Sequence, residues 1–510
     1  MAWTLLAALA LVVLQLRLLD GFWNHIDIHL YDGVVHVMNG KDLFDGHPPD
    51  GWLAWAPVLA TCYGLLGAAG VPLLAQQDTM AAAVSVAGTF ALWFAVRPIA
   101  GAAPSLLVAA SWTGTPLALH RATETVPSPT QMLAAVLCWL GVGLALRARW
   151  WIAATLFAVA AVERGEIVLP LAAAGLVACI VVRPRRRGLL LLGATVAAAC
   201  FHQSYEHSRN RAWLTFRQHY AGAALVRGDG VAGASFGLPD TTIARDFPGA
   251  TSLSGVAAVN PAALAHHVAW NVTQLPGTVS TLLFQPFGHT PWLRWSMLAL
   301  AGALIAWIGL RRAARVRRLL HAHRTALGIL AVGAAVTLLP QLLLMPRADL
   351  LLPGLPFAAA LAAVALRAAM GRERRWRWPV LGVVVVAALA APGPFGSQVS
   401  GLREGRAGLK LIQRQQLAPD ERLGTIWAPL SRFIDRPNVA PVSLDHLGLA
   451  GDQAAFDADF AAASPTLVVV APRTFGECGP RAPFLAHELA ADHWEIVDGF
   501  FPVLLYRRVR

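Results

Sequence analysis

Charged residues are scarce in this chain of 510 residues, in which Asp, Glu, Lys and Arg together make up only 14%. Soluble globular domains carry about 25% charged residues, so the composition excludes an ordinary soluble domain. Hydrophobic residues account for 56% of the chain, and many of them form uninterrupted apolar runs. A run of roughly 17–25 such residues is long enough to cross a lipid bilayer as a helix.

Cysteines are also few. Four of the five lie in apolar stretches, where cysteine behaves as a small hydrophobic residue. The sequence has no CxxC pair and no Cys/His spacing typical of zinc sites. It therefore excludes a disulfide framework and a structural zinc site.

The pattern of aromatic and basic residues that is typical of nucleic-acid binding is missing, although the formal net charge is +12. The arginines lie instead in short segments between apolar runs, where they orient a membrane protein. We therefore expect no nucleic-acid partner.

The apolar runs predict an all-α polytopic membrane domain of about eleven transmembrane helices, because only a helix satisfies its own backbone in hydrocarbon. The first run has no basic leader and no convincing cleavage site, so we expect an uncleaved span. The segment 52–70 is apolar but interrupted by Pro57 and rich in aromatic residues, which favours a helix lying in the membrane interface. The predicted spans are 3–19, 78–96, 103–119, 130–147, 150–163, 166–182, 188–204, 292–310, 325–344, 349–367 and 378–392.

The arginines predict the orientation of these spans. If the N-terminus is cytoplasmic, every basic segment of the membrane domain falls on the cytoplasmic side. The acidic first loop (20–77) and the long segment 205–291 then fall on the exoplasmic side. Counting 52–70 as a span would invert this bias. We therefore expect a multi-pass protein of the cell membrane with its C-terminal end outside.

Two domains are expected. Residues 1–392 form the transmembrane domain, and residues 393–510 form a small exoplasmic α/β domain, because 422–428, 466–471 and 494–508 resemble strands and 456–463 and 483–492 resemble helices. The segment 205–291 is too long for a simple connection. Its aromatic and amide side chains suit sugar or lipid recognition, and equally suit a small folded cap.

The first loop contains the residues with the clearest chemistry. Asp27 lies a few residues beyond the first span, where partial desolvation makes a carboxylate a stronger base. It is a candidate general base for an acceptor hydroxyl, and a solvated loop aspartate is the alternative. His25 and His29 alternate with Asp27, so on a strand the three side chains would share one face and suit a divalent cation. Otherwise the histidines bond lipid headgroups or backbone, and no cofactor is assigned.

Further charged residues lie in predicted outer turns. Glu124 is a second carboxylate for the same site, or forms a local ion pair that caps the next helix. Arg164, in the turn 163–166, suits a lipid phosphate because an arginine fork matches phosphate geometry; a local pair with a neighbouring glutamate is the alternative. Arg347 has the same two interpretations, with Asp349 as its local partner.

The order of these features resembles the GT-C glycosyltransferases, in particular the bacterial branch similar to protein O-mannosyltransferases and lipid A aminoarabinose transferases. In that family an acidic residue in the first outer loop is followed four positions later by tyrosine, as Asp27 is followed by Tyr31. A glycine-containing stretch and an interfacial helix come next, and here 38–50 leads into 52–70. Two spans later a second acidic residue stands where this chain has Glu124.

The resemblance continues in two later turns. The family's helical hairpin with a basic residue and glycine in its outer turn is matched by Arg164-Gly165, and its late outer Pro-Arg by Pro346-Arg347. The match extends over residues 1 to about 205 and, more loosely, over 290–392. Ile28 departs from the pattern, because the family often has Glu directly after the first acidic residue.

The resemblance implies an inverting transferase that takes a sugar from a polyprenyl-phosphate donor in the membrane. The acceptor would be a hydroxyl of a glycan, lipid or protein. It implies Asp27 as the general base, assisted by Glu124, and Arg164 and Arg347 as ligands of the leaving phosphate. The residues expected to contact substrate beside Asp27 are Tyr31, His25 and His29.

Two other classes of protein remain as alternatives. A polytopic transporter or lipid flippase commonly shows internal repeats and polar residues at mid-membrane, and this sequence has no repeat. A non-catalytic membrane protein would present residues 393–510 to a partner.

Overall fold

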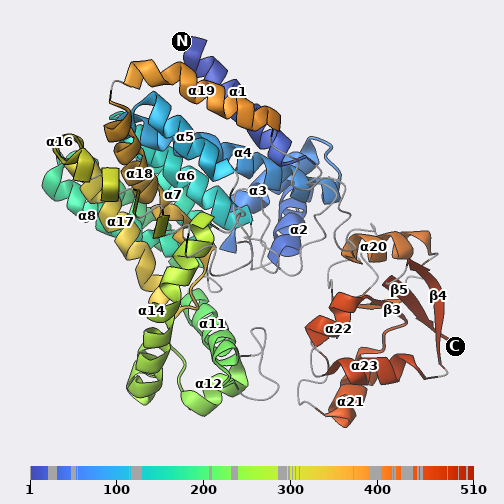
Figure 1. Ribbon diagram of the computed structural model, residues 1–510. Helices are drawn as coiled ribbons and strands as arrows, with labels where there is room; N and C mark the ends of the chain where they lie inside the picture. The colour runs from blue at the N-terminus through green and yellow to red at the C-terminus, as the bar shows by residue number, and fades with distance from the viewer. Residues whose placement is uncertain are drawn as a thin grey trace. The chain divides into compact units, whose positions relative to one another are not determined.

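The computed structural model is mostly helical, with one small sheet near the C-terminus (Figure 1). The chain divides into two compact units: residues 1–20, 51–59 and 79–396 form the first, and residues 21–50, 60–78 and 397–510 form the second. The structure describes residues 2–20, 32–47, 53, 55–113, 115, 129–205, 210–230, 239–284, 296, 299–300, 303–304, 306–308, 310–371, 373–390, 404–415, 417, 421–426, 440–444, 447, 452–478, 481–491, 493–500 and 503–509.

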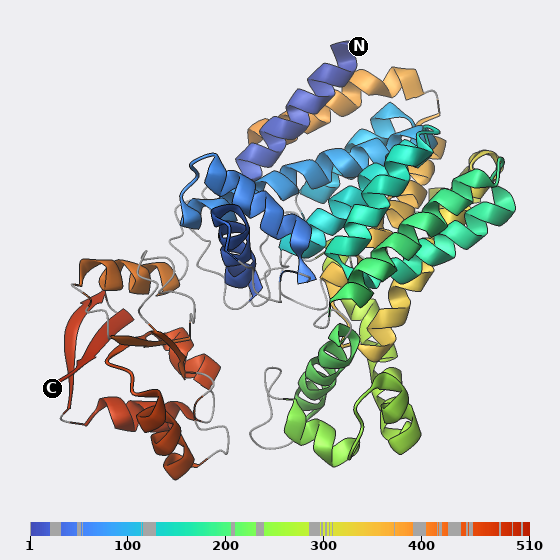
Figure 2. The same cartoon turned by 180° about the vertical axis from the view of Figure 1, so that it is seen from behind.

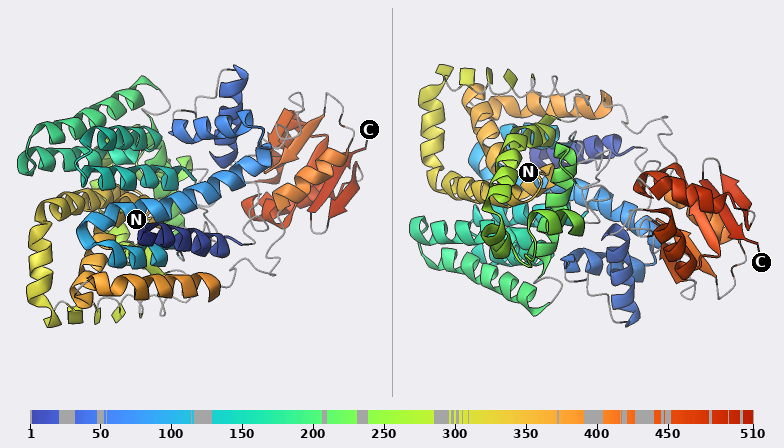
Figure 3. Two further views of the ribbon diagram at one scale, coloured as in Figure 1. Left: turned by 90° about the horizontal axis from the view of Figure 1, so that it is seen from above. Right: turned by 90° about the horizontal axis from the view of Figure 1, so that it is seen from below.

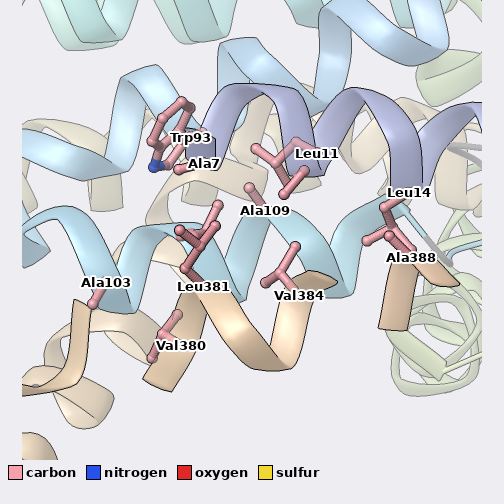
Figure 4. Close-up of a cluster of buried hydrophobic side chains, with 12 residues drawn as sticks. Ala7, Leu11, Leu14, Trp93, Ala103, Ala109, Val380, Leu381, Val384 and Ala388 are labelled. Carbon is pink, nitrogen blue, oxygen red and sulfur yellow. The ribbon is translucent and has the colours of Figure 1, made fainter. Parts of the chain in front are cut away.

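The first helical layer of the first unit packs α1 (Ala2–Leu18) beside α19 (Glu373–Ala390) and α5 (Ala102–Thr113) (Figure 3). Small side chains such as Ala7, Ala103 and Ala109 lie at the contacts with Leu11 and Val384 (Figure 4). Membrane helices associate through such close van der Waals packing, since hydrocarbon gives no hydrophobic drive between them. Next to this layer lie α4 (Leu73–Ala100) and α18 (Leu355–Met370).

A second layer consists of two helical hairpins (Figure 2). One joins α6 (Pro129–Ala145) to α7 (Trp150–Glu163), and the other joins α8 (Val168–Val181) to α9 (Arg186–Ser204). A Cβ atom at Gly188 would overlap the backbone of Cys179, so glycine is what lets α8 and α9 approach so closely. The remaining elements of this layer are η3 (Gly165–Ile167), α16 (Ala313–Ala322), α17 (Arg324–Leu343) and η5 (Ala348–Gly354).

The segment 205–291 contains a small helical cluster. It comprises α11 (Arg211–Arg227), α12 (Asp240–Asp246), α13 (Leu253–Val259) and α14 (Pro261–Phe284). Phe216, Tyr220 and Phe247 are buried together in its core. These aromatic side chains therefore build the folded cap, which was one of the two expectations, and are not on a recognition surface.

Among the residues that the structure describes, three helices are long and apolar enough to cross a membrane: Ala75–Ala100, Arg324–Leu343 and Ala348–Met370. Ten of the eleven predicted spans coincide with helices, but most of these helices are shorter, and a helix of 17 residues is only about 25 Å long. Eleven spans are therefore not confirmed, and the predicted span 292–310 lies largely outside the described residues. Large apolar side chains such as Ile180 (73%) and Val196 (61%) are exposed on outer helix faces, as expected beside lipid.

The second unit contains two helices from the N-terminal part of the chain. They are α2 (Asp32–Asp45) and most of α3 (Pro57–Ala68). Gly40 of α2 lies against the backbone of α3, where a Cβ atom would overlap the Ala60 carbonyl. The sequence analysis expected a polar loop here and missed α2, whose Val37 and Met38 are buried. The predicted interfacial helix 52–70 corresponds to α3.

The C-terminal part of this unit folds around a five-stranded sheet with the order β2-β1-β3-β5-β4. The pairs β1–β2 and β1–β3 are parallel, whereas β3–β5 and β4–β5 are antiparallel. The strands are β1 (Arg422–Thr425), β2 (Ala440–Ser443), β3 (Leu467–Val470), β4 (Trp494–Phe500) and β5 (Val503–Arg508). The accompanying helices are α20 (Glu404–Arg414), α21 (Gln453–Ala463), α22 (Pro472–Cys478) and α23 (Ala482–Leu489).

The small C-terminal sheet was predicted correctly. Strands β1, β3, β4 and β5 lie where the sequence placed them, because β3, for example, is a continuous apolar run buried on both faces. The short elements β2, α20 and α22 were missed. An ion pair within this unit joins Arg406 of α20 to Asp78 of α4, with Arg406 Nη2 2.7 Å from Asp78 Oδ1.

Candidate functional site

The turn between α7 and α8 holds Arg164 in extended backbone conformation, directly after the last residue of α7. Its Nε donates to Glu166 Oε1 at 2.7 Å, and its Nη1 donates to Thr130 Oγ1 at 3.3 Å. The guanidinium is only 16% exposed. Gly165 keeps the turn compact, since a Cβ atom there would lie 3.3 Å from His202 Nε2. The turn thus fixes one arginine at the end of a helical hairpin.

The turn between α17 and α18 holds Arg347 in a similar way. Its Nε and Nη2 donate to the two carboxylate oxygens of Asp349 at 3.1 and 2.6 Å. Its backbone N–H donates to Oε1 of the buried Gln341 at 2.8 Å. Within the described residues Arg347 Nη1 has no hydrogen-bond partner, and the side chain is 28% exposed. One edge of this arginine is therefore anchored while the other is available to a ligand.

Two side chains of helix α11, Arg211 and His219, interact with these turns. Arg211, at its start, places Nη2 3.8 Å from Glu166 Oε2 and stacks on Trp55 at 5.0 Å. Farther along, His219 is 4% exposed. Burial lowers the pKa of His219 to about 3, and the positive charges of Arg347 and Arg164 act in the same direction. Both arginines therefore lie close enough to influence the same neutral imidazole.

The two arginine–carboxylate pairs also interact with each other, because Asp349 is close enough to Arg164 to act on its charge. Trp139 Nε1 donates to the Leu352 carbonyl at 2.9 Å and so fixes η5 against α6. We call Arg164, Glu166, Arg211, Arg347 and Asp349 the paired arginine cluster. It is a fixed set of guanidinium donors, partly neutralised by two carboxylates, around a buried histidine.

Glu163 connects this cluster to the start of α3. Its side chain is fully buried, and its Oε2 accepts the backbone N–H groups of Val58 at 2.9 Å and Leu59 at 3.2 Å. Those N–H groups have no partner within a helix, so an acidic side chain at a helix N-terminus stabilises it. Pro57, directly before them, suits the first helical position. Glu163 was expected only as part of a self-paired turn, so this long-range cap was not predicted.

The structure brings Arg164 and Arg347 together, and each also forms the local ion pair that was its alternative interpretation. Asp27, Glu124, Tyr31, His25 and His29 lie outside the described residues. Arg211 and Thr130 were not predicted as part of a site, and His219 was expected only as one of the side chains of the segment 205–291 that suit recognition or a folded cap. Arg211 and Thr130 have no local signature, because each acts through a contact with a distant segment.

No group of three or more His, Cys, Asp or Glu side chains that would hold a metal ion occurs among the residues the structure describes. The proposed ligands His25, Asp27 and His29 are not among those residues. The divalent cation therefore stays an expectation from the sequence.

No family model and no curated protein matches the sequence. Among solved structures, the archaeal oligosaccharyltransferase AglB from Archaeoglobus fulgidus, in complex with an inhibitory peptide and a dolichol-phosphate, matches with a TM-score of 0.50 and 12% identity. That match covers 92% of this chain and 69% of the AglB chain. ArnT from Cupriavidus metallidurans, in the apo state, matches with a TM-score of 0.39 and 14% identity over 99% of this chain and 97% of its own.

At 12% identity the match to AglB shows a shared fold. It confirms the resemblance that the order of sequence features predicted. The chain therefore shares the fold of the archaeal oligosaccharyltransferase AglB.

Proposed function

We propose that this chain is an integral membrane glycosyltransferase that moves a sugar from a polyprenyl-phosphate donor to an acceptor hydroxyl at the outer face of the membrane. The observation that carries the proposal is that Arg164 and Arg347 are each held by a carboxylate two residues further on, and that the charges of both act on the buried His219. A fold shared with AglB, a structure that contains a dolichol-phosphate, supports the same class of ligand.

The pairing of each arginine favours phosphate binding. A guanidinium has five N–H donors in a fixed plane. In Arg347, Nε and Nη2 donate to the two carboxylate oxygens of Asp349. The carboxylate holds the plane still, so the remaining Nη1 edge is oriented before the ligand arrives. Pre-oriented charge stabilises a developing anion without reorganisation during the reaction.

The proposed reaction is a single displacement with inversion. The acceptor oxygen attacks the anomeric carbon while the bond from that carbon to the phosphate oxygen breaks, and the acceptor proton passes to the Asp27 carboxylate. The leaving polyprenyl phosphate carries the negative charge, which Arg347 and Arg164 stabilise. Glu124 orients the acceptor, and Tyr31, His25 and His29 contact the substrate.

The test uses membranes that contain the full chain and a set of radiolabelled polyprenyl-phosphate sugars. Asp27→Asn is expected to abolish sugar release from the donor, and Asp32→Asn, a change of the same kind in the same segment, is expected to preserve it. Full activity of Asp27→Asn would remove Asp27 as the base. A chain that moves the donor across the membrane but leaves the sugar–phosphate bond intact would instead be a transporter or flippase.

A further inference from the structure

An apolar groove of about 430 Å³ runs between α6, α8, α17 and α18 in the first unit. Its walls include Cys138, Leu171, Ile329 and Phe357. Thr337 and Gly354 line it near η5, on the side of the paired arginine cluster. A groove with hydrocarbon walls in a membrane helix bundle suits an acyl or prenyl chain.

The other end of the groove is lined by residues at the starts of three helices. Trp150 is the first residue of α7, Arg187 lies in the first turn of α9, and His323 directly precedes α17. The segments 144–150, 182–187 and 311–325 contain many arginines and not one Asp or Glu. We call these three segments the unpaired arginine rim. No carboxylate within these segments neutralises the positive charge of their arginines.

Arg187 is the arginine that lines the groove itself. Its Nη1 donates to the Arg183 carbonyl at 2.8 Å, and its guanidinium lies 5.9 Å from the centre of the Trp150 ring. Nε and Nη2 of Arg187 have no hydrogen-bond partner among the described residues. The side chain is thus held at the groove mouth while Nε and Nη2 remain available as donors. A guanidinium fork is well suited to a phosphate.

This end of the groove is far from the paired arginine cluster. Helix α8 has 14 residues, so about 21 Å separate its two ends. A lipid whose phosphate lies at Arg347 cannot also place that phosphate at Arg187. Phosphates bound at the two opposite ends of this groove would therefore belong to two different lipid molecules.

We propose that the groove mouth at Arg187 is a binding site for an anionic phospholipid of the predicted cytoplasmic leaflet, with the head group on Arg187 and an acyl chain in the groove. Basic pockets between membrane helices on that side favour anionic head groups. Helix α16 forms part of the unpaired arginine rim: Val316 and Leu319 pack against the bundle, while Arg317 and Arg318 are exposed.

The test measures binding of phosphatidylglycerol and of phosphatidylcholine to the purified full-length chain by native mass spectrometry. Phosphatidylglycerol is expected to bind saturably and more tightly. Arg187→Gln is expected to weaken this binding about five-fold, because each arginine near an anionic head group contributes about that much. Arg186→Gln removes the same charge from the same turn but does not line the groove, so it is expected to leave binding unchanged.

A second pair of variants tests the groove without changing charge. Gly333 lines the groove, and a Cβ atom there meets nothing within 4 Å, so Gly333→Leu fills the space meant for the acyl chain. Gly328 lies on the same helix, also has open space, and does not line the groove, so Gly328→Leu is the matched control. Phosphatidylglycerol binding is expected to fall only with Gly333→Leu.

Three results would overturn the proposal. Equal affinity for phosphatidylcholine would remove the charge selectivity. Equal losses with Arg186→Gln and Arg187→Gln would indicate general attraction to a basic surface. A polyprenyl phosphate that binds through Arg347 alone and still displaces phosphatidylglycerol would show that the whole groove holds the lipid-linked sugar donor. Sugar transfer is not needed for any of these measurements, so they stand apart from the proposed catalytic function.

Discussion

Arginines lie at both ends of the layer formed by the two helical hairpins, α6–α7 and α8–α9. They are paired with carboxylates at one end and have no acidic neighbour at the other. In the paired arginine cluster, Arg164 and Arg347 each bond a carboxylate two residues away and are 16% and 28% exposed. In the unpaired arginine rim, the arginines have no acidic neighbour in sequence, and most are exposed, as are Arg185 and Arg186. The same residue type is thus used in two ways within one bundle.

The difference follows from what each end has to do. A half-buried guanidinium is costly without a partner, and a carboxylate both compensates its charge and fixes its direction. Exposed arginines remain hydrated and need no such partner. They attract anionic headgroups and orient the chain in the membrane. Pairing with a carboxylate therefore distinguishes the arginines whose geometry matters from those that contribute only charge.

The largest effect is expected at Arg347. Replacing it with glutamine removes the Nη1 donor and the charge proposed to stabilise the leaving phosphate, so sugar transfer is expected to fall about 100-fold or more. Because Arg347→Gln leaves Asp349 buried without its partner, the double variant Arg347→Gln/Asp349→Asn serves as the control for folding. Transfer rates in membranes measure both. Activity within a few-fold of the parent in the double variant would contradict a role in phosphate binding.

Variants of Glu163 test how much the cap that it forms on the start of α3 contributes to the stability of the fold. Glu163→Leu removes the acceptor of two buried N–H groups, so the free energy of unfolding is expected to fall by about 2 kcal/mol. Glu163→Gln keeps one acceptor oxygen and is expected to retain most of that stability. Thermal unfolding in detergent micelles compares the two. Equal melting temperatures of the Leu and Gln variants would show that the cap contributes little.

The buried histidines predict a pH dependence. Burial lowers the pKa of His219 to about 3 and that of His267 to about 4, from an ordinary value of 6.5. Both are neutral when folded and take up protons on unfolding below pH 6.5, about two in total near pH 5. Stability is therefore complete above pH 6.5 and falls as the pH decreases toward 4.

Melting temperatures measured between pH 7.5 and 4.5 test this dependence. The double variant His219→Gln/His267→Gln is expected to show a weaker pH dependence than the parent chain. An unchanged slope would mean that other groups control acid stability.

The smallest effect is expected at Arg186, which represents the unpaired arginine rim. It is exposed and far from the paired arginine cluster, so Arg186→Gln is expected to change sugar transfer by less than about two-fold, as exposed charges usually contribute little. The same transfer assay is used as for Arg347. A loss comparable to that of Arg347→Gln would remove the functional distinction between paired and unpaired arginines.

Much of the molecule was predictable from local sequence. Apolar runs located the helices, β-branched runs located β1, β3, β4 and β5, and the fold shared with AglB confirms the resemblance drawn from the order of motifs. Helix α2 was missed because its polar residues suggested a loop. Only packing against α3, through Gly40, shows why that segment is helical.

By itself, the sequence determined that this is a membrane-type helical chain and that Arg164 and Arg347 each have an acid within two residues. Those properties depend on composition and on neighbours along the chain. Only the tertiary structure decided that both arginines act on the buried His219, that Glu163 caps α3, and that Arg187 stands at the mouth of an apolar groove. The physical reason is that each of these contacts joins segments far apart in sequence, and only helix packing brings them within the few ångströms over which hydrogen bonds and ion pairs act.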